Sequence, residues 1–274
     1  WLMFALPILA LSKETIIPTS ADKLVYLIAP LLIFTISVTM YGLLPYGPGI
    51  TPVRLNVGIL FFLAVSSTTT IAVLMAGWGS NNKYALLGGM RTVAQIISYE
   101  IPMALSIIGV VMLSGSLDLG DVTSAQKNIW FIVLQPIAFV VFVISAQAEL
   151  TRSPFDMTEA EQEFVAGYHT EYAGMRFALF FMAEYANLFA ISALGTILFL
   201  GGSNGPFLPA WMWFLIKTYA FILFMLWIRW SVMRIRVDKM MQFNWKVLIP
   251  ISLGNLLLTG VGIKLWQYFA SGRV

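Results

Sequence analysis

Long apolar runs separated by short polar segments dominate this sequence. Seven of them reach the ~20 residues that a helix needs to cross the ~30 Å hydrocarbon core of a bilayer. The sequence has 59% hydrophobic and only 11% charged residues, more apolar surface than a soluble fold of 274 residues can bury. It therefore predicts an all-α polytopic integral membrane helix bundle, a single transmembrane domain over 1–274, with spans at 24–44, 55–78, 93–115, 129–148, 177–200, 211–230 and 247–268.

The first eleven residues are apolar but too few to cross a bilayer. No basic segment precedes them, so they do not resemble a signal peptide. We interpret residues 1–11 as the remainder of an eighth, N-terminal span that is mostly missing.

The basic residues are distributed unevenly between the two sides of the predicted bundle. Lys217 lies inside a span, and four basic residues fall on one side, namely Arg54, Lys127, Lys264 and Arg273. The other side has eleven: Lys13, Lys23, Lys83, Arg91, Arg152, Arg176, Arg229, Arg234, Arg236, Lys239 and Lys246. Because Lys and Arg concentrate in cytoplasmic loops, we expect the loops 79–92, 149–176 and 231–246 to face the cytoplasm.

Acidic residues gather in one of these loops. Thr158 and Glu161 match a capping box that opens a short helix. Charged loops are usually only solvated, and a helix dipole stabilises acids in a first turn, so a purely structural interpretation stays open. A stretch of 23 residues in the loop 149–176 contains six of the thirteen acidic residues: Glu149, Asp156, Glu159, Glu161, Glu163 and Glu171.

Further ionisable residues lie within the predicted spans. Glu100 and Glu184 are eight and seven residues into their spans, roughly 10–12 Å below the cytoplasmic surface, and Glu149 ends the fourth span. An ionisable group at that depth costs about 2.5–3.5 kcal/mol, which favours a polar path over an isolated structural hydrogen bond. Lys217 enters from the opposite side and either terminates such a path or extends its amine towards that surface.

The chain has no cysteine and a single histidine, His169. It therefore offers no thiolate zinc site, no iron–sulfur cluster and no bis-histidine haem of its own. We interpret His169 as a hydrogen-bonding loop residue rather than a metal ligand. Glycine-rich phosphate loops and basic nucleic-acid patches are also missing from the sequence. We expect no metal, haem, flavin, NADH or nucleic acid to bind this chain, so redox centres belong to partner subunits.

Several motifs together resemble one family. The segment Glu149-Leu-Thr-Arg-Ser-Pro-Phe-Asp156, followed by Glu159, Glu161, Glu163, Gly167 and Glu171-Tyr172, resembles the signature loop of the quinone-site membrane subunit of respiratory complex I. This family comprises the H subunit of the bacterial enzyme and mitochondrial NADH dehydrogenase subunit 1. Further matching stretches are Gly77–Arg91, Ser98–Pro102, Phe180–Tyr185, Arg229–Asp238 and Trp245-Lys246, whereas residues 1–11 lack the family's N-terminal motifs.

The resemblance implies a subunit of a proton-pumping NADH:quinone oxidoreductase in the bacterial inner membrane. Its substrate is quinone, and its partners are peripheral iron–sulfur-bearing and quinone-site subunits and antiporter-like membrane subunits in the bilayer. Arg152, Phe155, Asp156, Glu159, Glu161 and Glu163 would form the quinone-chamber loop. The proton path would include Glu100, Glu149, Glu171, Glu184 and Lys217, and the cytoplasmic basic loop would include Arg229, Arg234, Arg236 and Asp238.

Two alternatives remain at this point. The chain could be the equivalent subunit of a membrane-bound hydrogenase or ferredoxin-coupled complex, whose cavity need not hold quinone. The buried acids could also belong to a stand-alone ion transporter. A transporter built from repeats should show two similar halves with helices broken at matching positions, and no such symmetry is visible in the sequence.

Overall fold

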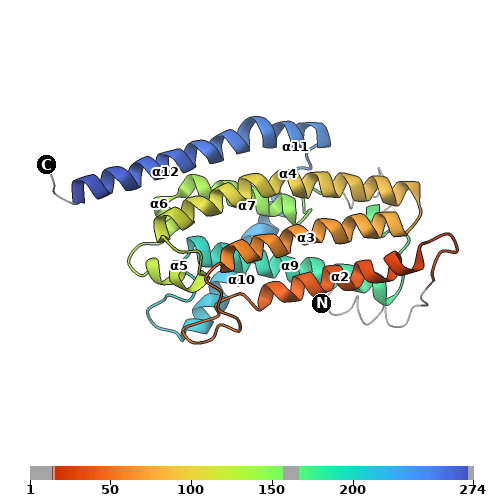
Figure 1. The fold of residues 1–274 in the computed structure, drawn as a ribbon, viewed down its shortest axis with the longest axis horizontal. Helices are drawn as coiled ribbons and strands as arrows, with labels where there is room; N and C mark the ends of the chain where they lie inside the picture. Colours follow the sequence, from red (N-terminus) through yellow and green to blue (C-terminus); the bar gives the residue numbers. More distant parts are fainter. Residues whose placement is uncertain (1–13, 15, 157–166, 271–274) are drawn as a thin grey trace.

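The computed structural model describes residues 14, 16–156 and 167–270 as a bundle of long helices (Figure 1). Within these ranges the β-type pairing is one isolated bridge between Gly47 and Ile50. The helices are α2 (Lys23–Tyr41), α3 (Gly58–Gly79), α4 (Lys83–Ser114), α5 (Leu119–Ala125), α6 (Phe131–Leu134), α7 (Pro136–Glu149), α9 (Met175–Phe199), α10 (Ala210–Ser231), α11 (Val237–Phe243) and α12 (Ile249–Ala270), with a 3-10 turn at Gly167–His169 and a π-helical turn at Asn244–Leu248.

Among the described residues, six helices are long and apolar enough to cross a membrane, which confirms the polytopic helix bundle. They are α2, α3, α4, α9, α10 and the continuous rod Val237–Phe269 formed by α11, the π-helical turn and α12. The expected span 129–148 is instead divided at Gln135 into α6 and the 14-residue α7. Pro136 has no N–H to continue the hydrogen-bond ladder, and Gln135 has non-helical backbone angles. The eighth span expected at 1–11 lies outside the described residues.

Two of the predicted loops are partly helical. α4 begins at Lys83, ten residues before the expected start of its span, because Asn82 caps it by accepting a hydrogen bond from the Tyr84 N–H at 2.9 Å. Most of the loop expected at 79–92 is therefore helix. Similarly, α11 occupies part of the loop expected at 231–246 and continues into α12. Polar residues in these stretches lower the apolar signal without ending the helix.

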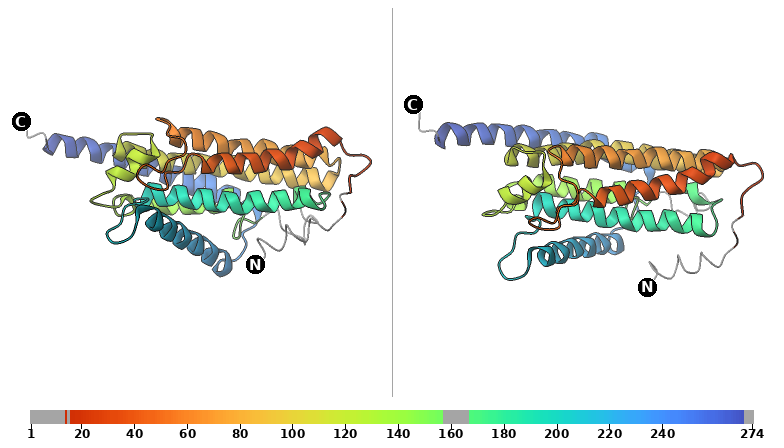
Figure 2. Two further views of the ribbon diagram at one scale, coloured as in Figure 1. Left: turned by 90° about the horizontal axis from the view of Figure 1, so that it is seen from below. Right: turned by 60° about the horizontal axis from the view of Figure 1, so that its bottom comes forward.

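The bundle is layered around α4. α12 packs along α4 and α7 at one edge and projects past the other helices at its C-terminal end, whereas α10 packs on α9 at the opposite edge (Figures 1 and 2). Leu257 and Leu258 of α12 are each 68% exposed. Such apolar surface faces lipid in a membrane protein. The core between the layers is filled by large buried side chains, among them Phe62, Phe142 and Phe199.

The loops 80–82, 150–156, 167–174 and 232–236 meet at one end of the bundle, which we call the basic end. Arg152, Arg234 and Arg236 lie in these loops, and Lys83 and Arg176 lie at the start of the adjoining helices α4 and α9. The Asn82 side-chain amide donates to the Glu171 carboxylate at 2.6 Å, and the Ile235 N–H donates to the Pro154 carbonyl at 3.0 Å. The expectation that these loops lie together is confirmed. That this end faces the cytoplasm stays a prediction from the charge distribution.

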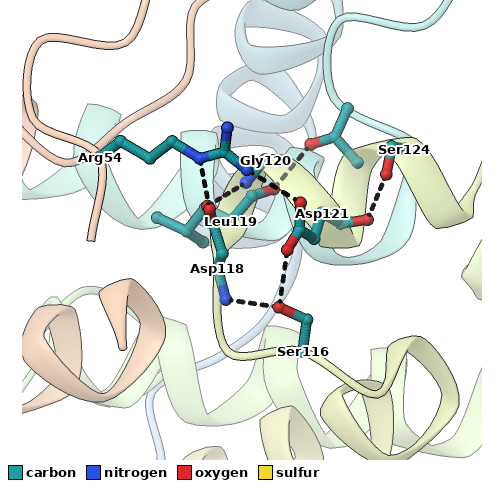
Figure 3. Close-up of polar contacts among 8 residues, drawn as sticks. Arg54, Ser116, Asp118, Leu119, Gly120, Asp121 and Ser124 are labelled. Carbon is teal, nitrogen blue, oxygen red and sulfur yellow. Dashed lines mark hydrogen bonds and ion pairs between the residues drawn. The ribbon is translucent and has the colours of Figure 1, made fainter. Parts of the chain in front are cut away.

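The opposite end has its own polar cluster (Figure 3). Arg54 pairs with Asp118 at 2.7 Å and with Asp121 at 3.1 Å. Asp118 also caps α5 by accepting from the Gly120 N–H at 2.8 Å, and Ser116 donates to Asp121. The cluster joins the loop between α2 and α3 to the loop between α4 and α5.

Candidate functional site

The segment 150–156 turns back into the bundle after α7 ends at Glu149. Gln95 on α4 holds it there, because its side-chain amide donates to the Ala148 carbonyl at 2.7 Å and to the Phe155 carbonyl at 2.8 Å. Phe155 is buried and packs against Tyr99, with ring centroids 5.2 Å apart. We call residues 150–156 the re-entrant segment. Its polar side chains are thereby placed inside the protein rather than in solvent.

Arg152 is the charge at the centre of this segment. It is 4% exposed, and one terminal nitrogen lies 2.8 Å from Oε1 of Glu184 on α9. Its guanidinium also stacks over the Tyr185 ring at 4.7 Å. Removing one partner of such a buried pair leaves the other charge uncompensated, which makes each dependent on the other. The ion pair connects the re-entrant segment to the centre of α9.

Asp156 connects the re-entrant segment to the expected basic loop. Its carboxylate lies 3.5 Å from the Arg234 guanidinium. Arg236 and Asp238 pair at 3.2 Å on the surface, where such pairs contribute about 0–1 kcal/mol. Arg229 lies in the last turn of α10. The structure thus brings Asp156 and Arg234 together and leaves Arg236 and Asp238 at the exposed rim.

A cavity of about 50 Å³ lies beneath the ion pair. Glu184, Glu149 and Asn187 contribute its polar lining, together with the hydroxyls of Thr69, Thr92 and Thr151. Oε2 of Glu149 and Oδ1 of Asn187 are buried and lack a hydrogen-bond partner among the described residues. About 10–15 Å³ suffices for one water when polar partners are present, so the cavity has the size and polarity to hold several waters.

Glu100 lies outside this cavity but is linked to it through Glu149. Glu149 on α7 interacts electrostatically with Glu100 on α4, and the Ser66 hydroxyl on α3 lies within hydrogen-bonding reach of Glu149. Ser67 donates a hydrogen bond to Glu100. α4 starts earlier than expected. Glu100 is therefore seventeen residues, or about 25 Å, after Lys83, the first residue of α4, whereas the predicted span placed it only eight residues from the start. Three helices therefore converge on one carboxylate pair.

Two expected path residues lie elsewhere. Glu171 accepts a hydrogen bond from the Asn82 side-chain amide at 2.6 Å, at the basic end. Lys217 donates to the Leu200 and Asn204 carbonyls, each at 2.7 Å, at the C-terminal end of α9. Leu200 is sixteen residues after Glu184, or roughly 24 Å along the helix. The described contacts do not bring either residue together with Glu100, Glu149 and Glu184.

Glu159, Glu161 and Glu163, with the capping box expected at Thr158, lie outside the described residues. Beyond them the chain returns to α4, where Gly88 and Gly167 are in backbone contact: a Cβ on Gly88 would meet the Gly167 Cα at 2.9 Å. His169 follows, buried among the rings of Tyr168, Phe177 and Phe181. Burial lowers the pKa of His169 to about 4, so the ring is neutral at physiological pH.

The sequence analysis did not single out several residues that build this site. Gln95 positions the re-entrant segment, Tyr185 supports Arg152, Asn187 lines the cavity, and Ser66 and Ser67 contact the carboxylates. All are polar residues within apolar spans, which is the signal that would have identified them. In the described part of the chain, no three His, Cys, Asp or Glu side chains are grouped as a metal site.

The fold and site define a class of protein: an integral membrane helix bundle with an ion-paired re-entrant loop above buried carboxylates. A family model described as NADH dehydrogenase matches residues 4–260. Proteins named as the H subunit of NADH-quinone oxidoreductase are 49% identical in Carboxydothermus hydrogenoformans, over 93% of this chain and 74% of the relative, and 51% identical in Dehalococcoides mccartyi strain CBDB1, over 92% and 71%. The Geobacillus kaustophilus protein of that name is 49% identical over 94% and 78%.

The chain therefore belongs to the NADH dehydrogenase family of membrane subunits, and the resemblance read from the signature loop is confirmed. It is one of the subunits of an oxidoreductase complex, and the hydrogenase-subunit and transporter alternatives are not favoured.

Proposed function

We propose that this chain forms the membrane side of a quinone-reduction chamber and the start of the proton path that couples quinone reduction to proton translocation. The relatives are named as a component of NADH-quinone oxidoreductase, which supports the reaction. The observation that supports the coupling is the ion pair between buried Arg152 and half-buried Glu184, because it joins the re-entrant segment directly to the carboxylate cavity.

Under this proposal the basic end closes the chamber. The chamber loop is the predicted quinone-site loop 149–176. Its chamber residues are Arg152, Phe155, Asp156, Glu159, Glu161 and Glu163. Peripheral iron–sulfur-bearing subunits dock there and deliver electrons, and antiporter-like subunits accept the coupling signal within the bacterial inner membrane. Arg234 supports the chamber by pairing with Asp156.

Proton movement then follows from charge. Reducing a quinone to a quinol takes up two electrons and two protons, so loop carboxylates next to the reacting headgroup change their protonation state. A change in negative charge there alters how strongly Arg152 is held by its partners. Glu184 is paired with Arg152, so weakening that pair frees the Glu184 carboxylate to accept a proton. Glu149 lines the same cavity as Glu184, and it passes the proton inward to Glu100, with which it interacts electrostatically.

The test replaces Glu184 with Gln, which keeps shape and hydrogen bonding but cannot ionise. We expect the complex to assemble and to oxidise NADH with an artificial acceptor that bypasses quinone. Quinone-linked turnover and proton pumping in reconstituted vesicles should both fall by roughly 100-fold or more, the low end of a lost acid–base group. Glu184→Asp, which restores a carboxylate, should recover part of both activities.

Two further results bear on the same proposal. Arg152→Lys keeps the charge but loses the guanidinium fork, so quinone reduction should fall while assembly survives. Normal pumping by assembled Glu184→Gln would mean that this carboxylate is only a structural partner of Arg152, and it would contradict the proposed coupling.

A further inference from the structure

Helix α3 contains five consecutive hydroxyl residues, 66–70, in the middle of an otherwise apolar sequence. Most of these hydroxyls bond to backbone carbonyls three or four residues earlier, a local arrangement that satisfies them within the helix. Ser67 differs, because its hydroxyl also reaches across to the Glu100 carboxylate on α4. The Ser66 hydroxyl, which bonds the Leu63 carbonyl, lies close to the Glu149 carboxylate on α7. Two neighbouring hydroxyls thus lie beside two carboxylates from two different helices.

The helix geometry explains this arrangement. Successive residues of an α-helix point about 100° apart, so one face of α3 presents Ser66 and the adjoining face presents Ser67. The hydroxyl oxygens lie 2.9 and 3.0 Å from the same acceptor, the Leu63 carbonyl oxygen. They are therefore at most about 6 Å apart, a separation that one bridging water spans.

We propose that Ser66 and Ser67 form a hydroxyl relay that passes protons between Glu149 and Glu100, an inference that rests on the proton path proposed above. A hydroxyl both donates and accepts and rotates freely to do either, whereas an apolar side chain at the same position interrupts the chain. Ser66 is 1% exposed, so solvent outside the protein cannot replace it.

The transfer conserves protons at each oxygen. The Glu149 carboxyl gives its proton to Oγ of Ser66, and the Ser66 hydroxyl proton passes to one water between the serines. That water gives a proton to Oγ of Ser67, whose own proton passes to the Glu100 carboxylate. Glu149 ends ionised, Glu100 ends protonated, and both hydroxyls and the water are restored after reorientation.

The experiment compares alanine and glycine at each serine in the assembled complex. Alanine removes the hydroxyl and fills the space with a methyl group. Glycine leaves room close to the ~30 Å³ share of one water, which can carry the proton instead. We therefore expect pumping and quinone-linked turnover to decrease in the order serine, glycine, alanine, with alanine lower than serine by roughly 100-fold. A purely structural role predicts glycine as the worst variant, because glycine weakens a helix interior more than alanine.

Three controls make the outcome decisive. Thr68→Ala deletes a hydroxyl that bonds only the Ala64 carbonyl among the described residues, so pumping should be unchanged. Ser66→Thr and Ser67→Thr keep the hydroxyl and should retain activity, and NADH oxidation with an artificial acceptor reports assembly. Normal pumping in both alanine variants, or glycine below alanine, overturns the relay. Impaired Glu100→Gln beside normal alanine variants overturns the relay alone, whereas normal Glu100→Gln overturns the proton path and the relay with it.

Discussion

Buried ionisable side chains in this chain are compensated in different ways. Arg152 is matched by a carboxylate, whereas Lys217 is held by two backbone carbonyls and lies 4.8 Å from the Trp130 ring. Lys217 therefore stabilises the C-terminal end of α9, where a cation also interacts favourably with the helix dipole. His169 has neither solution. It is 9% exposed, and aromatic rings surround it.

The burial of His169 predicts a pH-dependent stability. Its pKa falls from 6.5 to about 4 in the folded chain, so the unfolded chain binds the proton more readily. The stability contributed by the neutral ring is complete above pH 6.5 and is lost as pH falls towards 4. At pH 5 we expect a loss of about 2 kcal/mol from this residue. His169→Phe keeps an aromatic ring without the titration and should remove that part of the acid sensitivity, measured as the shift in thermal unfolding between pH 7.5 and pH 5. An unchanged shift in His169→Phe would contradict the assignment.

Helices and loops were predictable from the sequence to different degrees. Length and apolar content predicted seven spans, because crossing a bilayer demands both. Six helices in the described part of the chain meet these criteria, and the seventh predicted span is divided. The break at Gln135 and the early start of α4 at Lys83 depend on proline chemistry and on the Asn82 cap, which a hydropathy pattern does not weigh. The loop 149–176 was identifiable by its carboxylates. The pairing of Arg152 with Glu184, 32 positions away, depends on tertiary packing and had no local signal.

The polar cluster at the opposite end anchors the short helix α5, and variants of Asp118 can show how. Asp118 has two roles, because one oxygen caps α5 and the other pairs with Arg54 (Figure 3). Asp118→Asn keeps a capping oxygen and loses the charge. Since the side chain of Arg54 is 67% exposed, we expect Asp118→Asn to lower stability only slightly. Asp118→Ala loses both contacts and should cost about 1–2 kcal/mol in unfolding free energy. Equal destabilisation by the two variants, measured by thermal unfolding of the purified complex, would show that the cap contributes nothing.

At the scale of the whole molecule, the two ends of the bundle differ in charge and in the depth of their loops. The basic end folds its loop inward and holds it with Gln95, so buried carboxylates lie below a surface rich in Lys and Arg. The opposite end closes on short loops whose charges pair locally around Arg54. This asymmetry suits a protein that receives a signal at one face and passes it into the membrane.

The charge asymmetry also predicts orientation, and the absence of cysteine makes it directly measurable. Met233 in the basic-end loop 232–236 is 89% exposed, and Phe207 at the opposite end is 92% exposed. Each position can therefore accept a single cysteine without loss of core packing. We expect a membrane-impermeant thiol reagent to label Phe207→Cys in right-side-out vesicles and Met233→Cys only in inside-out vesicles, because basic loops stay in the cytoplasm. Removing peripheral subunits should increase the labelling of Met233→Cys and leave Phe207→Cys unchanged, since the proposed docking face is the basic end. Labelling of Met233→Cys from the outside would invert the topology and place the re-entrant segment on the wrong side for the proposed partners.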